Sequence, residues 1–264
     1  DKFLGGRMSN TRQTFPTIPQ AFLNRVRTQP SQRIFHHKDG TDWKAVSWQE
    51  YFDAVQEISM GLIELGVKKG ESVCIASNTC FDWAMSDMAI MGALGVTVPI
   101  YASNTAEESA YIFNHCEARV ILVENTKQLE KMVSVKHQMP NLAKIVVFSF
   151  QATPETAAMK DVLSLSALRE LGKRALSQGG KKTFEQNLMS LKPKDLFTIC
   201  YTSGTTGVPK GVVLSHDSLV SVIADVDAVY GHAVGEADHL LSFLPYSHIF
   251  GHVESMAVYH FGWN

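Results

Sequence analysis

The sequence predicts an α/β fold with two blocks of mainly parallel sheet flanked by helices. Short, nearly all-apolar segments alternate with longer segments whose apolar residues recur at helical spacing. Strands that are apolar on both faces are typical of a parallel sheet covered by helices on both sides. The pattern is interrupted between about residues 150 and 190 and then resumes, which separates the two blocks.

The first block is expected over residues 33–150, after a polar tail and one short helix in residues 1–32. A strand-like segment turns at Asp39-Gly40. Ser47 and Glu50 then fit a capping box that opens a helix ending at Gly66. The elements expected next are strand 72–77, helix 81–94, strand 96–101, a second capping box and helix 105–116, strand 120–123, helix 126–138 and strand 144–148.

A connecting segment is expected over residues 151–190. It begins with a break rich in Thr, Ala and Pro, continues with a helix over 165–176 and has a polar linker at 178–182. The second block, residues 191–264, is expected to be incomplete. Its elements are strand 196–201, a loop, strand 212–214, helix 217–230, strand 240–244 and a helix from about residue 249.

Charge and cysteine usage exclude several classes of protein. The 264 residues include 24 Lys+Arg and 26 Asp+Glu, so there is no broad basic field for nucleic acid. The four cysteines form no CxxC pair, which argues against a disulfide framework or a zinc site and indicates a reducing compartment. The longest apolar stretch, 88–100, is short and broken by Gly and Pro. We therefore expect a cytoplasmic protein.

The segment from Tyr201 to Gly211 stands apart from the rest of the chain. Between two apolar strands it holds four Ser or Thr hydroxyls, three glycines and Lys210. Glycines let the backbone approach a ligand closely, and successive N–H groups, hydroxyls and a Lys can grip a polyphosphate. The spacing matches neither the Walker A loop nor the dinucleotide fingerprint. A plain Ser/Thr/Gly surface loop is the alternative for such a composition.

Four segments in order resemble the core motifs of the adenylate-forming superfamily of acyl-CoA synthetases, luciferases and peptide-synthetase adenylation domains. They are residues 46–51, 91–101, 201–211 and 244–251. The last, Leu-Pro-Tyr-Ser-His-Ile-Phe-Gly, is most similar to long-chain fatty acyl-CoA ligases. The resemblance implies part of the large N-terminal domain of such an enzyme.

The resemblance also implies a reaction. A fatty acid and ATP form an acyl-adenylate, and the acyl group then passes to CoA. The implied cofactors are ATP, Mg²⁺ and CoA, with the Mg²⁺ and CoA contacts largely outside this chain. A lipid substrate is also compatible with peripheral membrane association. Two alternatives stay open: an acyl-AMP ligase or luciferase-like enzyme that does not use CoA, and a truncated, non-catalytic nucleotide- or acyl-binding protein.

By resemblance, the phosphates of ATP are bound by the loop residues and by one lysine. These are Thr202, Ser203, Gly204, Thr205, Thr206, Gly207 and Lys210, of which Thr205 and Lys210 are the expected catalytic residues. The acyl side is expected to include His248, Phe250 and Gly251, and no metal ligand set is evident. His252 is expected to pack structurally, and His216 to belong to a helix cap. Phe243 and Tyr246 fit a tunnel wall or a core equally well.

Members of the superfamily are longer and carry further motifs downstream. These include a Glu for Mg²⁺, an Asp for the ribose and a C-terminal domain with a catalytic Lys, none of which is evident here. The resemblance therefore implies that a C-terminal portion of the same protein is missing. We expect the 264-residue chain alone to be inactive, to leave an apolar face exposed and to have a mobile phosphate loop without ATP.

Overall fold

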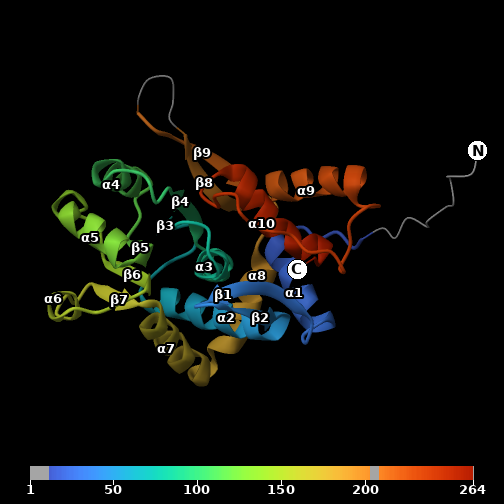
Figure 1. Ribbon diagram of the computed structural model, residues 1–264, viewed down its shortest axis with the longest axis horizontal. Helices are drawn as coiled ribbons and strands as arrows, with labels where there is room; N and C mark the ends of the chain where they lie inside the picture. The colour runs from blue at the N-terminus through green and yellow to red at the C-terminus, as the bar shows by residue number, and fades with distance from the viewer. Residues whose placement is uncertain (1–11, 203–207, 264) are drawn as a thin grey trace, which may run out of the picture.

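The computed structural model describes residues 12–202 and 208–263. Over these residues the chain forms a seven-stranded sheet in the order β7-β6-β5-β3-β4-β8-β9, and a separate hairpin of β1 (Arg33–Asp39) and β2 (Asp42–Ser47) (Figure 1). The predicted α/β class and mainly parallel sheet are thus confirmed.

Six of the seven strands run parallel. They are β3 (Ser72–Ala76), β4 (Val96–Ile100), β5 (Val120–Asn125), β6 (Lys144–Ser149), β7 (Val162–Ser164) and β8 (Leu196–Thr202). The edge strand β9 (Lys210–Ser215) pairs antiparallel with β8. The carboxyl ends of the six parallel strands therefore share one edge of the sheet, where open α/β sheets bind their ligands.

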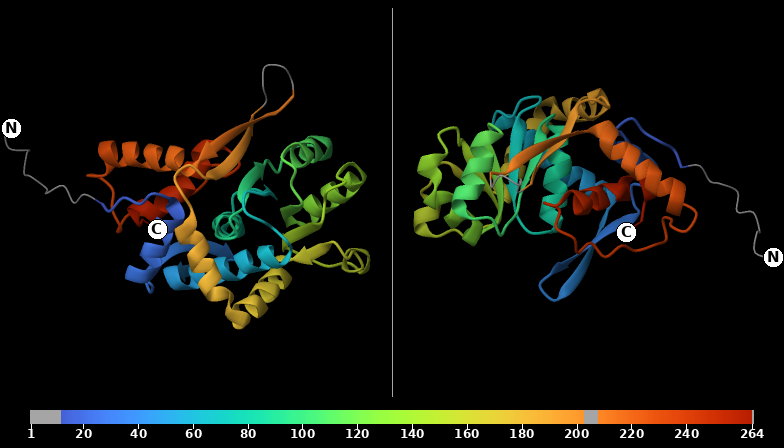
Figure 2. Two further views of the ribbon diagram at one scale, coloured as in Figure 1. Left: turned by 180° about the vertical axis from the view of Figure 1, so that it is seen from behind. Right: turned by 90° about the horizontal axis from the view of Figure 1, so that it is seen from above.

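Helices cover both faces of the sheet between β3 and β6, as Figure 2 shows from behind and from above. One face packs on α2 (Trp48–Glu64), α3 (Phe81–Gly92), α7 (Leu165–Ala175) and α8 (Lys181–Ser190), and the other on α4 (Ala106–His115) and α5 (Thr126–Ser134). Alternate residues of β3 enter the two cores: Val73 and Ile75 the first, Cys74 and Ala76 the second. This alternation explains why the strands are apolar throughout.

The remaining helices are α1 (Ile18–Thr28), α9 (His216–Tyr230) and α10 (Ile249–Phe261), with the single turn α6 (Pro154–Ala157). Helix α10 contacts both α1 and α9, beside β8 and β9 (Figure 1). Both predicted capping boxes are present, Ser47 with Glu50 and Thr105 with Glu108. Each supplies two hydrogen bonds to helix N–H groups that would otherwise lack a partner.

The two predicted blocks form one continuous sheet rather than two. Strand β8 of the second block pairs with β4 of the first, with Thr97 opposite Thr198. Thr198 Oγ1 also donates to Thr97 O at 2.7 Å. A buried edge at β4 would leave backbone N–H and C=O groups without partners, and β8 satisfies them.

The connecting segment contains more structure than the sequence predicts. It supplies β7 to the sheet, and the polar linker expected at 178–182 is wrong: a π-helical turn, Leu176–Gly180, leads directly into α8. Gly179 takes a φ of 104°, which lets the chain kink there. The buried Phe184 and Leu188 lie one turn apart on α8 and hold it against the core.

The strand predicted over 240–244 is also wrong, because this segment is loop. It pairs with no other strand among the described residues. Leu241 and Phe243 are 73% and 74% exposed. Residues 240–244 are apolar except for Ser242, a composition with strand propensity, but a strand forms only where another strand offers hydrogen bonds.

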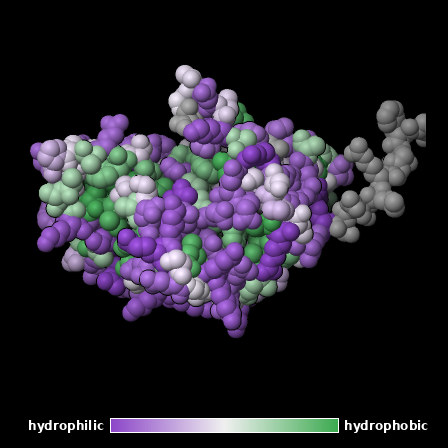
Figure 3. All heavy atoms as spheres, turned by 90° about the horizontal axis from the view of Figure 1, so that it is seen from below, coloured by the Kyte–Doolittle hydropathy of each residue, from purple (hydrophilic) through white to green (hydrophobic). Residues whose placement is uncertain are grey.

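The face seen from below in Figure 3 is mostly polar, with apolar side chains gathered in a few patches. Within residues 12–202 and 208–263, no helix has the length and apolar character needed to cross a bilayer.

Candidate active site

The candidate site lies at the carboxyl edge of the sheet, where β3, β4 and β8 end. The loop that precedes α10 is fixed to this edge by three hydrogen bonds. Ser247 Oγ donates to Ile100 O at 3.3 Å, Thr79 Oγ1 donates to Leu244 O at 2.6 Å, and the Tyr246 N–H donates to Thr79 Oγ1 at 3.1 Å. The sheet thus brings residues from three distant parts of the sequence together.

The β8-β9 hairpin carries the predicted phosphate loop. Thr202 and Lys210 are direct cross-strand partners at the two ends of the loop, and both are exposed. The other predicted loop residues, Ser203, Gly204, Thr205, Thr206 and Gly207, lie outside the described residues. Their assignment, and the expectation of mobility, stay predictions.

The loop end of the β8-β9 hairpin is anchored to α4. Tyr201 OH lies 2.7 Å from His115 Nδ1, and Tyr111 OH donates to Pro209 O at 3.2 Å. Burial raises the pKa of Tyr201 well above its usual value, so the hydroxyl stays neutral. A Cβ at Gly211 would lie 2.8 Å from Ile199 Cγ2 and 3.2 Å from the Tyr201 ring. Glycine is therefore required at position 211, opposite Tyr201 in the hairpin.

His248 is the N-cap of α10, and its side chain is exposed. Its Nδ1 accepts from the Phe250 N–H at 3.2 Å. In the neutral ring the proton is then on Nε2, which is free to donate to a ligand. Phe250 is 64% exposed. Gly251 is buried, and a Cβ there would lie 2.4 Å from Pro245 O. The structure thus gives Gly251 a packing reason, while the substrate contacts of all three residues stay predictions.

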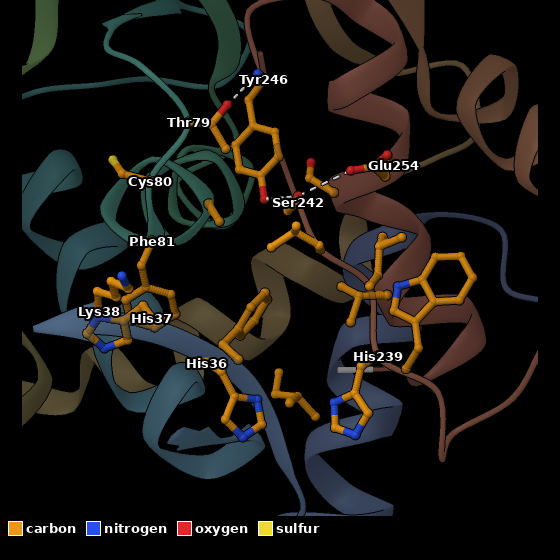
Figure 4. Close-up of a pocket in the computed structure, with 18 of the residues that line it drawn as sticks. His36, His37, Lys38, Thr79, Cys80, Phe81, His239, Ser242, Tyr246 and Glu254 are labelled. Carbon is orange, nitrogen blue, oxygen red and sulfur yellow. Dashed lines mark hydrogen bonds between the residues drawn. The ribbon is translucent and has the colours of Figure 1, made fainter. Parts of the chain in front are cut away.

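A pocket of about 710 Å³ opens between the β1-β2 hairpin, the start of α3, the loop before α10 and α10 itself (Figure 4). Much of its lining is apolar: Ile34, Phe35, Trp43, Phe81, Ala84, Leu240, Leu241, Val258 and Trp263. His36 and His239 lie together on one side, with ring centroids 6.1 Å apart, and Lys38 and His37 lie nearby (Figure 4). Such a lining suits an elongated apolar ligand with an anionic end.

The opposite wall of the pocket is a hydrogen-bonded group. Ser242 Oγ lies 2.8 Å from Tyr246 OH and donates to Glu254 Oε1 at 3.2 Å (Figure 4). Burial raises the pKa of Glu254 and of Tyr246. Tyr246 therefore belongs to the pocket wall and to the core at once, since its ring also packs on Trp83 at 5.1 Å.

Sequence reasoning missed Thr79, Ser242 and Glu254. None of these three residues lies in any of the four motifs. Thr79 alone gives a usable signal, because it lies three residues after the end of a buried strand and so is close to the carboxyl edge of the sheet. In the described part of the chain, no group of three or more His, Cys, Asp or Glu could hold a metal ion.

The chain belongs to the family of AMP-binding enzymes, whose pattern it matches over residues 22–263. It is 32% identical over 235 residues to the long-chain-fatty-acid–CoA ligase ACSBG2 of Xenopus laevis, a match covering 88% of this chain and 31% of that protein. It is 29% identical over 238 residues to the long-chain-fatty-acid–CoA ligase FadD15 of Mycobacterium bovis, covering 89% and 37%. The chain thus spans about a third of the length of the curated relatives it matches.

Solved structures share the fold. The long-chain-fatty-acid-CoA ligase FadD1 of Archaeoglobus fulgidus superposes with a TM-score of 0.75 at 18% identity, covering 98% of this chain and 48% of that one. The anthranilate CoA ligase AuaEII in complex with anthranoyl-AMP gives 0.73 at 18% identity, covering 98% and 46%. The fold is therefore that found in the N-terminal domains of adenylate-forming enzymes.

Proposed function

We propose that this chain is part of an enzyme that activates a fatty acid with ATP and passes the acyl group to CoA. The observation that carries the proposal is the hydroxyl- and glycine-rich segment 201–211, held on a β-hairpin at the carboxyl edge of the sheet. An apolar pocket lies along the same edge. Membership of the AMP-binding family and the similarity to two ligases named for long-chain fatty acids support the same assignment.

The chemistry requires two substitutions. In the first, a carboxylate oxygen attacks the α-phosphorus of ATP, and the bond to the β-phosphate breaks to release pyrophosphate. In the second, the thiolate of CoA attacks the acyl carbonyl and AMP leaves. Lys210 is proposed to neutralise the phosphates of the departing pyrophosphate, with Thr202, Ser203, Gly204, Thr205, Thr206 and Gly207 donating hydrogen bonds to them. Mg²⁺ would accompany ATP, but the described residues offer no ligand set for it, so we assign none to this chain.

The acyl chain is proposed to occupy the pocket between the β1-β2 hairpin and α10. His248, Phe250 and Gly251 lie where the loop before α10 reaches the sheet edge, and His248 Nε2 can donate to a carboxylate or acyl-adenylate oxygen. Each CH₂ buried in the pocket would add about 0.8 kcal/mol of binding. Affinity for fatty acids should therefore rise with chain length until the pocket is full.

The proposal extends to the place where the enzyme works. We propose a cytoplasmic enzyme that touches membranes through the β1-β2 hairpin. Trp43 is 60% exposed on this hairpin, with Lys38 Nζ over its ring at 5.6 Å. An exposed Trp beside a cation is a combination that suits the membrane–water interface.

The test is fatty-acid-dependent exchange of pyrophosphate into ATP, measured on the full-length protein. Lys210→Ala should reduce exchange by about 10- to 150-fold, since one charge-assisted contact contributes roughly 1.5–3 kcal/mol. Lys194→Ala is the matched control, because Lys194 is an exposed lysine paired with Asp217 outside the loop. Equal exchange by both variants would rule out the assignment of Lys210.

A further inference from the structure

Two fully buried ionisable side chains, Asp87 and His252, lie behind the candidate site. Asp87 is on α3 and His252 is on α10, and His252 Nε2 lies 2.7 Å from Asp87 Oδ2. Removing both charges from water is costly, and a buried ion pair often gives no net stability over an apolar pair. Stability alone is therefore a poor explanation for the pair.

The pair is connected to His248 through the first turn of α10. The His252 N–H donates to His248 O at 2.9 Å. The His248 N–H in turn donates to Pro245 O at 2.9 Å. A shift of His252 along or around the helix axis would therefore move the imidazole of His248.

The pair also touches the strand that leads to the phosphate loop. The His252 ring packs on Phe197 of β8, with centroids 4.6 Å apart, and meets Trp83 of α3 edge-on at 5.0 Å. Trp83 in turn packs on the pocket residue Tyr246. His252 thus stands where β8, α3 and α10 meet.

The charge state of the pair follows from its surroundings. Burial lowers the pKa of His252, but the Asp87 carboxylate and its hydrogen bond, helped by Cys200, outweigh burial and raise the pKa to about 9. At neutral pH the ring is therefore an imidazolium paired with a carboxylate. The other ionisable groups around the pair are Cys200 on β8, His216 on α9, Tyr51 on α2, Tyr246, and Tyr259 on α10.

Both members of the pair have unused hydrogen-bonding capacity. Among the residues that the structure describes, Asp87 Oδ1 and His252 Nδ1 have no hydrogen-bond partner. The Nε2–Oδ2 contact and the packing on Phe197 and Trp83 together set the ring orientation, and removing either Asp87 or His252 leaves a buried charge uncompensated.

We propose that Asp87 and His252 form a positioning pair that holds α10, and with it His248, in register with β8. The inference rests on the proposed adenylation reaction. Both side chains are fully buried, so in this proposal they act through His248 and the strand beside it.

The first experiment measures fatty-acid-dependent pyrophosphate exchange in the full-length enzyme. Asp87→Asn and His252→Gln should each lower kcat by about 10- to 100-fold, because a small misplacement of a reacting group is sufficient for such a loss. The double variant should be no slower than either single variant, since both break the same contact. His252→Arg keeps the positive charge and should restore most of the rate.

The pH dependence of kcat distinguishes a pair that positions α10 through its charge from a pair that only fills space. Wild-type kcat should fall as the pH rises through 9, because His252 then loses its proton. The His252→Arg profile should stay level over the same range, since Arg stays protonated.

The control is the second ion pair on α10. His260 Nε2 lies 2.9 Å from Asp227 Oδ2 at the far end of the helix. His260→Gln removes this contact and should leave kcat unchanged. If His260→Gln slows exchange as much as His252→Gln, or if the double variant is much slower than either single variant, the pair is only structural and the proposal is overturned.

A second measurement does not depend on the reaction. In the full-length enzyme, the carbon-bound imidazole NMR signals of His248 should shift as His252 loses its proton near pH 9, and this shift should be absent in His252→Gln but present in His260→Gln. Signals that do not change when His252 loses its proton would overturn the proposal. If the full-length enzyme forms no acyl-adenylate, the proposed function fails, while the NMR result still decides whether the pair positions α10.

Discussion

The two ends of the sheet differ in how completely they are covered. Around β3, β5 and β6 both faces pack on helices, and most of the strand residues are buried. Around β9 and α9 the apolar side chains are open to solvent. The exposed set includes Val212, Val213, Val222, Val226, Val229 and Tyr230. The described part of the chain therefore leaves an apolar surface exposed on β9 and α9.

The difference teaches where sequence patterns are reliable. In the covered region every strand and helix expected from periodicity is present within a few residues. In the open region the pattern over 240–244 is equally apolar, but the segment is loop. A local pattern produces an element only when its apolar face and its backbone groups find partners.

The largest expected effect comes from truncating a core side chain in the covered region. Ile121→Ala on β5 removes a fully buried side chain and should cost about 2–5 kcal/mol of unfolding free energy. Val213→Ala on β9, where the side chain is 55% exposed, should change it by less than about 0.5 kcal/mol. Urea unfolding of both variants tests the contrast. Equal losses would show that β9 is covered in solution.

The next effect concerns two buried histidines at the boundary between the regions. The pKa of His252 is raised from 6.5 to about 9, so its stabilising effect is complete below pH 6.5 and is lost as the pH rises through 9. Burial lowers the pKa of His216 to about 4, so stability is lost as the pH falls from 6.5 through 4. Each change is on the order of 3 kcal/mol.

The free energy of unfolding should therefore be highest near pH 6.5. Urea unfolding across pH 4 to 9 would show the maximum. His216→Phe should flatten the acid side only, and His252→Arg the alkaline side only. A profile that is flat from pH 4 to 9 in the wild type would contradict both assignments.

A smaller effect distinguishes helix caps in the two regions. Ser47 accepts from the Glu50 N–H in a complete capping box, whereas Ser215, the N-cap of α9, makes no such bond. Ser47→Ala should cost about 1 kcal/mol and Ser215→Ala less. Thermal unfolding of the two variants gives the comparison, and a larger loss for Ser215→Ala would contradict it.

The smallest expected change in folding stability comes from replacing exposed valines of β9 and α9, although the same replacement should clearly change self-association of the chain. The exposed valines of β9 and α9 should make the 264-residue chain self-associate at micromolar concentration. Val213→Lys with Val229→Lys should reduce association without lowering unfolding free energy. Sedimentation velocity over a concentration series measures it. A wild-type chain that stays monomeric throughout would contradict the prediction.

Part of the candidate site could be predicted from the sequence alone. The phosphate loop is continuous, so its hydroxyls, glycines and Lys210 are visible as one string. The pocket is not, because its walls come from residues 34–43, 79–84, 239–246 and 254–263. No local pattern links Ser242 to Glu254, since their contact exists only after α10 has packed.

The sequence by itself determined the alternation of buried strands and capped helices, and the loop between β8 and β9. These depend on interactions between residues close in the chain, such as Ser47 with Glu50. Only the tertiary structure decided that the two blocks share one sheet, that 240–244 is not a strand, and that His252 faces Asp87. Each of these depends on partners that are distant in sequence, and local periodicity carries no information about which distant groups will meet.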